Sequence, residues 1–240
     1  MNQPTKLLLD ADILIFQACV VVEKVAQWDD DVWTIMSDPR DAIIVLEDTI
    51  TTFEDDTGIA TQDMVFALSD AKNFRYDVTS TYKSNRVGKR KPLCYPSVKA
   101  YLINKYVTKV LPNVEGDDVL GLLQTDDTAI WSRDKDLKQI AGLHWVDDDW
   151  EEITEAEADR FFLFQCLVGD TSDGYSGCPG VGPVRANAIL DNDCSWEAVV
   201  AAYEKKGLFE ADAYINAHQA RILRPGEYNF TTMEPILWTA

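Results

Sequence analysis

Three short apolar runs each lead into an acidic residue, and this pattern constrains the fold more than any other feature of the sequence. The runs are residues 7–9, 64–68 and 128–131, and the acids that follow them are Asp10, Asp70, and Asp134 with Asp136. Continuous apolar runs of this length are typical of parallel strands that are buried on both faces. Because the carboxyl ends of parallel strands meet at one sheet edge, we expect these carboxylates to converge there.

The segments between these runs have helical signals. We expect helices over about 41–56, before Gly58, and over about 97–108, 116–123 and 183–190, with a hairpin over 20–35 and a strand over 143–146. Thr154 and Glu157 form a capping box for a helix that ends near Leu167. Alternating strands and helices predict an α/β fold with a mostly parallel central sheet flanked by helices. We expect an α/β core over 1–155 and a helical part over 156–240, together forming one compact unit.

Charge is distributed very unevenly along this chain, whose formal net charge is −19. Residues 72–109 contain ten basic residues against one acid, Asp77, and five tyrosines lie among them. Cations interleaved with aromatic rings are typical of surfaces that bind phosphates and stack on bases. This basic segment therefore predicts a nucleic-acid partner, although the overall charge repels polyanions.

The acidic residues suit a metal centre. Glu115, Asp117 and Asp118 open the helix 116–123, and together with the strand-end acids they could share one pocket. So many like charges require either raised pKa values or bound divalent cations, and oxygen ligands favour Mg²⁺ or Mn²⁺. Two such ions are suited to phosphodiester hydrolysis. The two histidines lie far apart in the sequence and the P-loop pattern is absent, so zinc catalysis, a histidine-based triad and a P-loop hydrolase fit poorly.

A glycine-rich stretch runs from Gly169 to Pro183 and cannot form a regular helix or strand. We expect a turn between two helices whose exposed N–H groups bind a phosphate of the DNA backbone. The longest largely apolar stretch, residues 13–22, is too short to span a bilayer, and five scattered cysteines indicate reduced thiols in a cytoplasmic setting. We therefore expect no membrane association.

Taken in order, these motifs resemble those of the flap endonuclease and 5′→3′ exonuclease superfamily over residues 6–190. The resemblance rests on Leu7 to Asp10, on Asp70 with Phe74-Arg75 and Tyr82 to Arg86, and on the acidic motifs 115–118 and 132–136. It continues through Gly169-Asp170, Ser172-Asp173 and the turn 177–182. The size and the Asp10-Ala11-Asp12 start are most similar to stand-alone exonucleases of podovirus-type phages.

The resemblance implies a helical arch over about 72–109 and a helix-three-turn-helix over about 160–190. It implies a metal site formed by Asp10, Asp70, Glu115, Asp117, Asp118, Asp134, Asp136, Asp170 and Asp173. Asp10, Asp118, Lys83 and Arg86 would be catalytic. DNA would be bound by Arg75, Tyr82, Lys83, Arg86, Lys89, Arg90, Lys91, Gly180, Gly182 and Arg185. A K⁺ ion would lie near Cys178 and Val181.

Two stretches depart from the family pattern. Val184 and Arg185 occupy the lysine and threonine positions of the family's turn, and Gly174-Tyr175 replace Asn-Ile. These changes affect the details of duplex binding rather than the chemistry.

The resulting hypothesis is a metal-dependent 5′→3′ exonuclease of duplex DNA that also removes flaps and RNA primers, acting on 5′ ends, nicks and RNA–DNA hybrids beside other replication proteins. Two alternatives stay open at this point. A PIN-type ribonuclease shares acids at the sheet edge, and a non-catalytic DNA end-binding protein would keep the basic segment and the turn.

Overall fold

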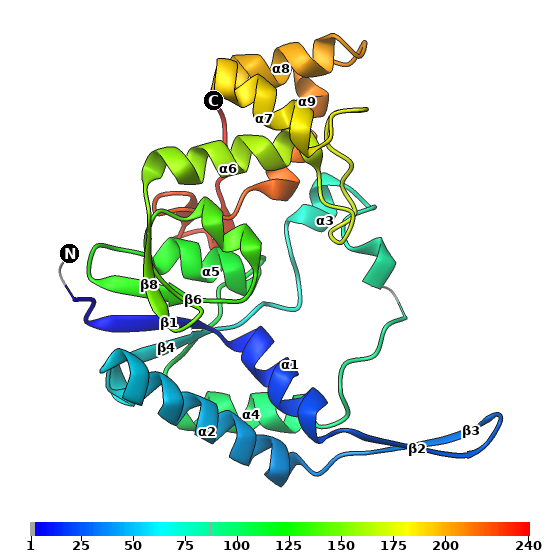
Figure 1. The fold of residues 1–240 in the computed structure, drawn as a ribbon, viewed down its shortest axis with the longest axis vertical. Coiled ribbons are helices and arrows are strands. Elements are labelled where there is room, and N and C mark those ends of the chain that lie inside the picture. Colours follow the sequence, from blue (N-terminus) through cyan, green and yellow to red (C-terminus); the bar gives the residue numbers. More distant parts are fainter. Residues whose placement is uncertain (1–2, 87) are drawn as a thin grey trace.

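A six-stranded sheet forms the centre of the computed structural model, which describes residues 3–86 and 88–240 (Figure 1). The strand order is β5-β4-β1-β6-β7-β8. Their bounds are β1 Lys6–Asp10, β4 Met64–Ala67, β5 Thr108–Lys109, β6 Thr128–Trp131, β7 Gly142–Val146 and β8 Asp149–Ile153. Neighbouring strands are parallel except for the pair β7 and β8. The mostly parallel α/β sheet expected from the sequence is thus confirmed.

Helices cover both faces of the sheet because alternate residues of its central strands point to opposite sides. Leu7 and Leu9 of β1 pack into one apolar core, whereas Leu8 packs into another. The first core lies under α1 (Ala11–Val22), α2 (Pro39–Thr57) and α4 (Tyr95–Lys105). The second lies under α5 (Gly116–Leu123) and the segment 222–228. A continuous apolar run such as 7–9 is therefore required for burial on both sides.

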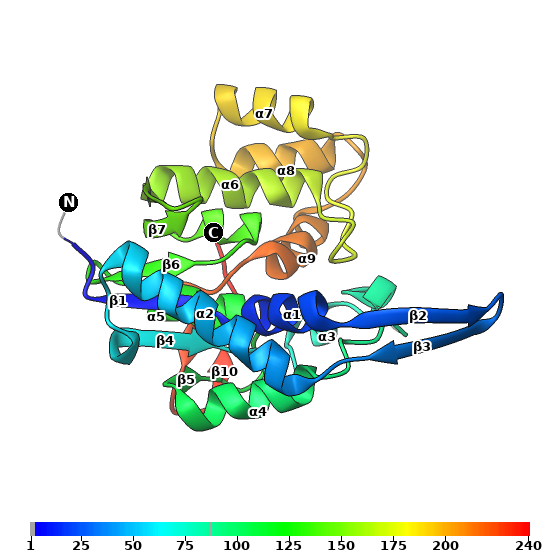
Figure 2. The same cartoon turned by 60° about the horizontal axis from the view of Figure 1, so that its bottom comes forward.

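Four further helices pack around a third core above the sheet (Figure 2). They are α6 (Glu155–Val168), α7 (Pro183–Asn192), α8 (Trp196–Glu204) and α9 (Glu210–Ala220). Thr154 and Glu157 form the expected capping box, and Gly58 caps α2 with a φ of 71°. A small ribbon, β9 (Tyr228–Asn229) with β10 (Glu234–Pro235), follows, so the last part of the chain contains more than helices and turns. Within the described residues, every helix is too short or too polar to cross a bilayer.

The predicted hairpin exists, but its first strand is shifted. Residues 20–22 complete α1, and the hairpin pairs β2 (Lys24–Asp29) with β3 (Val32–Met36). Residues 147 and 148 form an exposed turn between β7 and β8. Asp147 and Asp148 adopt positive φ angles and turn the chain directly into the antiparallel edge strand β8.

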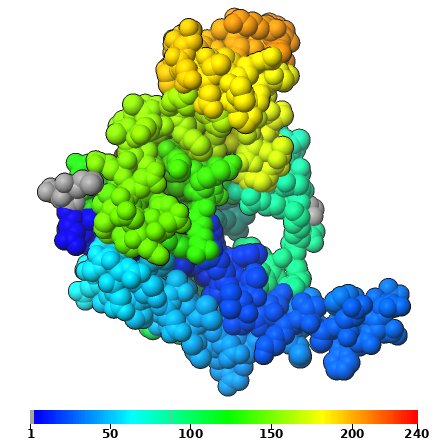
Figure 3. All heavy atoms as spheres, in the orientation of Figure 1, coloured from blue at the N-terminus to red at the C-terminus, as the bar shows by residue number. Residues whose placement is uncertain are grey.

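The arch expected over 72–109 contains the helices α3 (Arg75–Val78) and α4, and α4 corresponds to the helix expected over 97–108. The connection between these helices, here called the arch segment (residues 79–94), is less regular. Among its described residues, regular structure is limited to one 3₁₀ turn, Ser84–Arg86. Gly88 with a φ of 82° and Pro92 both disfavour a continuous helix. Figure 3 shows an opening between this segment and the body of the protein.

Candidate active site

A cavity of about 320 Å³ lies beyond the carboxyl end of β1 and β6, at the N-terminus of α5. Here it is called the acidic cavity. Its acidic lining residues are Asp10, Asp12, Glu115, Asp117 and Asp134, and its basic ones are Lys83, Arg86 and Lys91. The cavity thus combines carboxylates from the sheet edge and α5 with cations from the arch segment.

Asp10 occupies the centre of this arrangement. It is buried at the end of β1, where its carboxylate accepts hydrogen bonds from the Ile13 N–H (3.1 Å) and the Ser132 hydroxyl (2.8 Å). Burial, with repulsion from Asp12 and Asp134, raises its pKa to about 6. Burial and repulsion from Asp10 and Asp134 also raise the pKa of Asp117 well above its usual range. These carboxylates repel one another, so a proton or a cation that binds between them is stabilised.

Asp12 joins this group, a contribution that the sequence left open. Its carboxylate accepts hydrogen bonds from the Ser69 N–H (2.7 Å) and the Tyr95 hydroxyl (2.5 Å) and lines the cavity. The signal was the Asp10-x-Asp12 spacing, which puts both acids at the junction of β1 and α1. Asp70, in contrast, does not line the cavity. Its carboxylate accepts hydrogen bonds from the N–H groups of Asn113 and Ala71, and these bonds help to lower its pKa.

Asp118 and Arg75 correct two further predictions. Asp118 is fully buried and accepts hydrogen bonds from both terminal nitrogens of Arg75, each at 2.7 Å. Its oxygens also accept hydrogen bonds from the backbone N–H groups of Glu115 and Leu223. Glu115 is the N-cap residue of α5, and the Asp118 side chain, three residues later, bonds back to the Glu115 N–H. Asp118 therefore points inward, and the two acids do not share one open face. Arg75 is only 3% exposed, so it holds the core rather than offering a surface to DNA.

The other predicted acids form a second group beside the cavity. Asp170 pairs with Lys135 at 2.9 Å, and Asp173 pairs with Arg86 at 2.6 Å. Asp136 accepts a hydrogen bond from the Gln165 amide, and burial together with repulsion from Asp134 raises its pKa to about 6. This group is paired with Lys135 and with Arg86, which also lines the acidic cavity.

Lys83 connects the two groups. Its ammonium lies 2.6 Å from Glu115 and 3.7 Å from Asp173, and its side chain is only 12% exposed. Burial acts to lower the pKa of Lys83, but Glu115 and Asp173 outweigh it and raise the pKa, so the ammonium stays charged. Tyr82 donates its hydroxyl to Glu115 at 2.7 Å and is buried beside Lys83. Tyr82, Lys83 and Glu115 are all site residues predicted from the sequence, and the structure brings these three side chains together.

The backbone of Lys83 has a φ of 48°, which is uncommon for a residue other than glycine. A hydrogen bond of 2.7 Å from its N–H to the Asp173 carbonyl holds this conformation. Gly174 packs against the same loop, where an added Cβ would lie 2.5 Å from the Thr81 carbonyl oxygen. The glycine that departs from the family pattern thus allows the arch segment to dock on the turn 170–175.

The rest of the arch segment carries further cations. Arg86 and Lys89 are exposed, and Lys91 lies with its ammonium 4.1 Å from the centre of the Tyr95 ring. Arg90 pairs with Glu23 at the end of α1, so it anchors the segment. Val87 lies outside the described residues.

The glycine-rich turn joins α6 to α7 as expected. Gly169 and Gly177 pack against each other's backbone, since an added Cβ on either would come within 2.5 Å of it. Gly182 faces open space, Gly180 approaches only the Lys206 ammonium, and Arg185 donates to the Gly180 carbonyl at 2.8 Å. Cys178 and Val181 are buried, and the Cys178 carbonyl accepts a hydrogen bond from the Val181 N–H.

No family model matches the chain. It is 30% identical to the exonuclease of Escherichia phage T7 and 29% identical to the exodeoxyribonuclease of Enterobacteria phage T3; each alignment covers 97% of this chain and 92% of the relative. Among solved structures, its fold is similar to a phage T5 protein co-crystallised with metal ions, with a TM-score of 0.65 at 13% identity, covering 88% of this chain and 87% of that one. A T5 flap endonuclease structure with DNA and metal ions also gives a TM-score of 0.65, at 14% identity, covering 88% of this chain and 86% of that one. The similarity to the T7 enzyme over the full length agrees with the motif order and with the α/β core. The chain belongs to the flap endonuclease and 5′→3′ exonuclease superfamily.

Proposed function

We propose that the protein hydrolyses phosphodiester bonds of DNA from 5′ ends in the acidic cavity, as a 5′→3′ exonuclease with flap endonuclease activity. One observation carries this proposal above the others. Buried, mutually repelling carboxylates share the cavity with Lys83, and a basic segment stands in front of it. The T7 and T3 relatives, named as exonucleases and similar over the whole chain, support the same activity.

The donor chemistry of the cavity fits divalent ions. Its acidic ligands are all oxygens, and burial together with mutual repulsion raises the pKa values of Asp10 and Asp117, a cost that a hard cation would relieve. We propose that Asp10, Asp12, Glu115, Asp117 and Asp134 hold Mg²⁺ or Mn²⁺. The second acidic group of Asp136, Asp170 and Asp173 would contribute to a second ion. In the described residues, no three such side chains already surround a single point as ligands. A bound metal would supply an activated water and would stabilise the leaving oxygen.

Residues of this chain position the substrate around that site. Lys83 keeps its charge beside Glu115, where it can contact a phosphate oxygen and stabilise the negative charge that develops there. Arg86 and Lys91 line the same cavity and orient the phosphate from the arch side. The opening seen in Figure 3 is where a single strand with a free 5′ end would pass toward the cavity.

The glycine-rich turn would hold the duplex behind the cavity. Gly180 and Gly182 lie on the exposed side of the turn, and Arg185 adds a cation at the start of α7. This arrangement suits contact with backbone phosphates without reading sequence. A K⁺ ion held by carbonyls near Cys178 and Val181 belongs to the same proposal. We also propose that the protein acts on RNA–DNA hybrids, cooperates with other replication proteins and is located in the host cytoplasm.

Substrate comparison under single-turnover conditions tests this function. The substrates are a 5′-labelled nicked duplex, a 5′ flap, an RNA-primed hybrid and a single-stranded RNA, each with Mg²⁺, Mn²⁺ or EDTA. We expect short labelled 5′ products with metal only. Cleavage of single-stranded RNA alone would support the PIN-type ribonuclease instead, and tight binding without cleavage would support the end-binding protein.

A further inference from the structure

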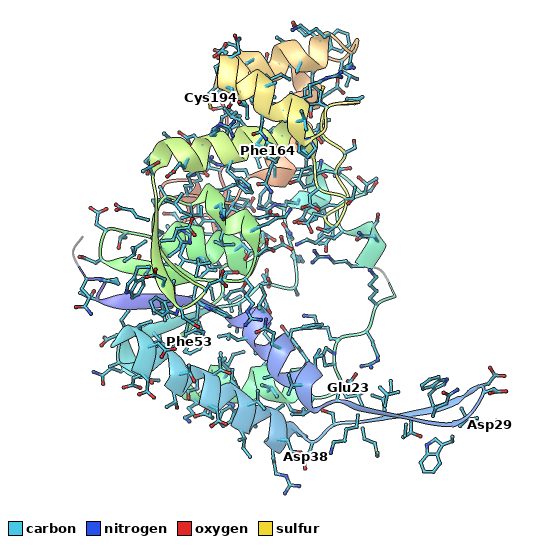
Figure 4. The ribbon with its side chains drawn as sticks, viewed as in Figure 1. Glu23, Asp29, Asp38, Phe53, Phe164 and Cys194 are labelled. Carbon is cyan, nitrogen blue, oxygen red and sulfur yellow. The ribbon has the colours of Figure 1, made fainter. Side chains whose placement is uncertain are left out.

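The β2–β3 hairpin (Lys24–Met36) projects beyond the rest of the protein. Figures 1 and 2 both show it as a narrow ribbon that leaves the body between α1 and α2. Its root is fixed, since the Glu23 carboxylate accepts hydrogen bonds from the Arg90 guanidinium and the Leu93 N–H. Figure 4 shows Glu23 and Asp38 at the root and Asp29 near the tip.

Both faces of this ribbon carry large apolar side chains in contact with solvent. Trp28 is 72% exposed and donates its indole N–H to the Thr34 hydroxyl, so it shares a face with Val32 and Met36. Trp33, at 57% exposed, lies on the opposite face with Val25. A two-stranded hairpin is barely stable alone in water, and an exposed apolar patch of this kind marks an interaction surface.

The charges of the ribbon disfavour DNA as its occupant. Asp29, Asp30 and Asp31 are all exposed at the tip, where they would repel a phosphate backbone. The root is basic, because exposed Lys24 begins the first strand and exposed Lys89 and Lys91 flank Arg90, which is bound to Glu23. The hairpin therefore has an acidic tip, a basic root and apolar faces between them.

We propose that the hairpins of two copies of this chain pack antiparallel about a two-fold axis. Each acidic tip then meets the partner's basic root, and the faces that carry Trp28, Val32 and Met36 pack against each other between the ribbons. A two-fold interface requires a surface that is complementary to itself, and a ribbon with opposite charges at its two ends meets that requirement. This inference goes beyond the nuclease activity and does not depend on it.

Sedimentation velocity from about 5 to 200 μM, in EDTA at 0.15 M salt, tests the dimer. We expect the dimer fraction to rise with concentration, and the Trp28→Ser/Trp33→Ser variant to stay monomeric. The matched control is Phe209→Ser/Phe230→Ser, which removes two exposed aromatic rings elsewhere and should associate like the wild type. A wild type that is monomeric throughout, or association that survives the tryptophan changes, would overturn the proposal.

A charge exchange tests the antiparallel arrangement itself. Asp29→Lys/Asp30→Lys/Asp31→Lys reverses the tip, and Lys24→Glu/Lys89→Glu/Lys91→Glu reverses the root. Each variant alone should be monomeric, and an equimolar mixture should form heterodimers because both tip-to-root contacts are attractive again. Monomers in the mixture would contradict this arrangement. A monomeric wild type whose affinity for nicked DNA falls on loss of the tryptophans would assign the hairpin to DNA instead.

Discussion

The ammonium of Lys83 lies 2.6 Å from the Glu115 carboxylate, so the arch segment and the acidic cavity are joined by a direct ion pair. The side chain that would contact a phosphate is therefore already anchored at the cavity. A substrate phosphate would compete with Glu115 for this ammonium.

Lys83→Ala should lower the single-turnover cleavage rate about 100-fold or more, because a preorganised charge beside the reacting phosphate is lost. Affinity for nicked duplex in Ca²⁺ should change little, since many other cations contribute to it. Lys6→Ala is the matched control, because Lys6 is exposed at the opposite end of β1. A wild-type rate for Lys83→Ala would remove this residue from the site.

Asp117→Asn and Asp118→Asn should separate chemistry from stability, although the two residues are adjacent. Asp117→Asn should abolish Mg²⁺-dependent cleavage without loss of metal-free stability, because it relieves repulsion from Asp10 and Asp134. Asp118→Asn should destabilise the fold by about 3–5 kcal/mol, since it leaves the buried Arg75 charge without its partner. Urea unfolding and single-turnover rates measure both effects. Equal losses of stability in the two variants would contradict this assignment.

Asp10 should make the metal-free protein sensitive to pH. A carboxyl whose pKa rises from 3.8 to about 6 on folding binds its proton more tightly in the folded state. Its contribution to the free energy of unfolding therefore falls as pH rises from about 4 to 6, by ~3 kcal/mol in total. In EDTA, the free energy of unfolding of Asp10→Asn minus that of the wild type should increase by this amount over that range. A difference that is independent of pH would show that folding does not raise the pKa of the Asp10 carboxyl.

Gly174→Ala should impair cleavage through the position of the arch segment. The new Cβ would press on the Thr81 carbonyl at 2.5 Å, in a residue with a φ of 83°. We expect about 1–3 kcal/mol of destabilisation and a reduced single-turnover rate. Gly226→Ala is the control, because its φ is 93° and nothing lies within 4 Å of an added Cβ. If both variants cleave equally well, the contact with Thr81 does not position Lys83.

The parallel sheet could be predicted from the sequence because Leu7 to Leu9 and Thr128 to Trp131 have the continuous apolarity of doubly covered strands. The role of Asp118 could not be predicted in this way. An acid that binds a metal and an acid that pairs with a buried arginine have the same local pattern, and only the tertiary contact with Arg75 distinguishes them. Asp70 was misplaced for a similar reason, since the backbone N–H of Asn113 comes from a distant segment.

The direction of digestion and its dependence on the cavity test the central claim most directly. The measurement is single-turnover digestion of one duplex carrying a label at either its 5′ or its 3′ end, by wild type and Asp117→Asn, in Mg²⁺ and in EDTA. The account predicts early release of short products from the 5′ label, by wild type in Mg²⁺ only. Early release from the 3′ label, or equal activity of Asp117→Asn, would contradict it.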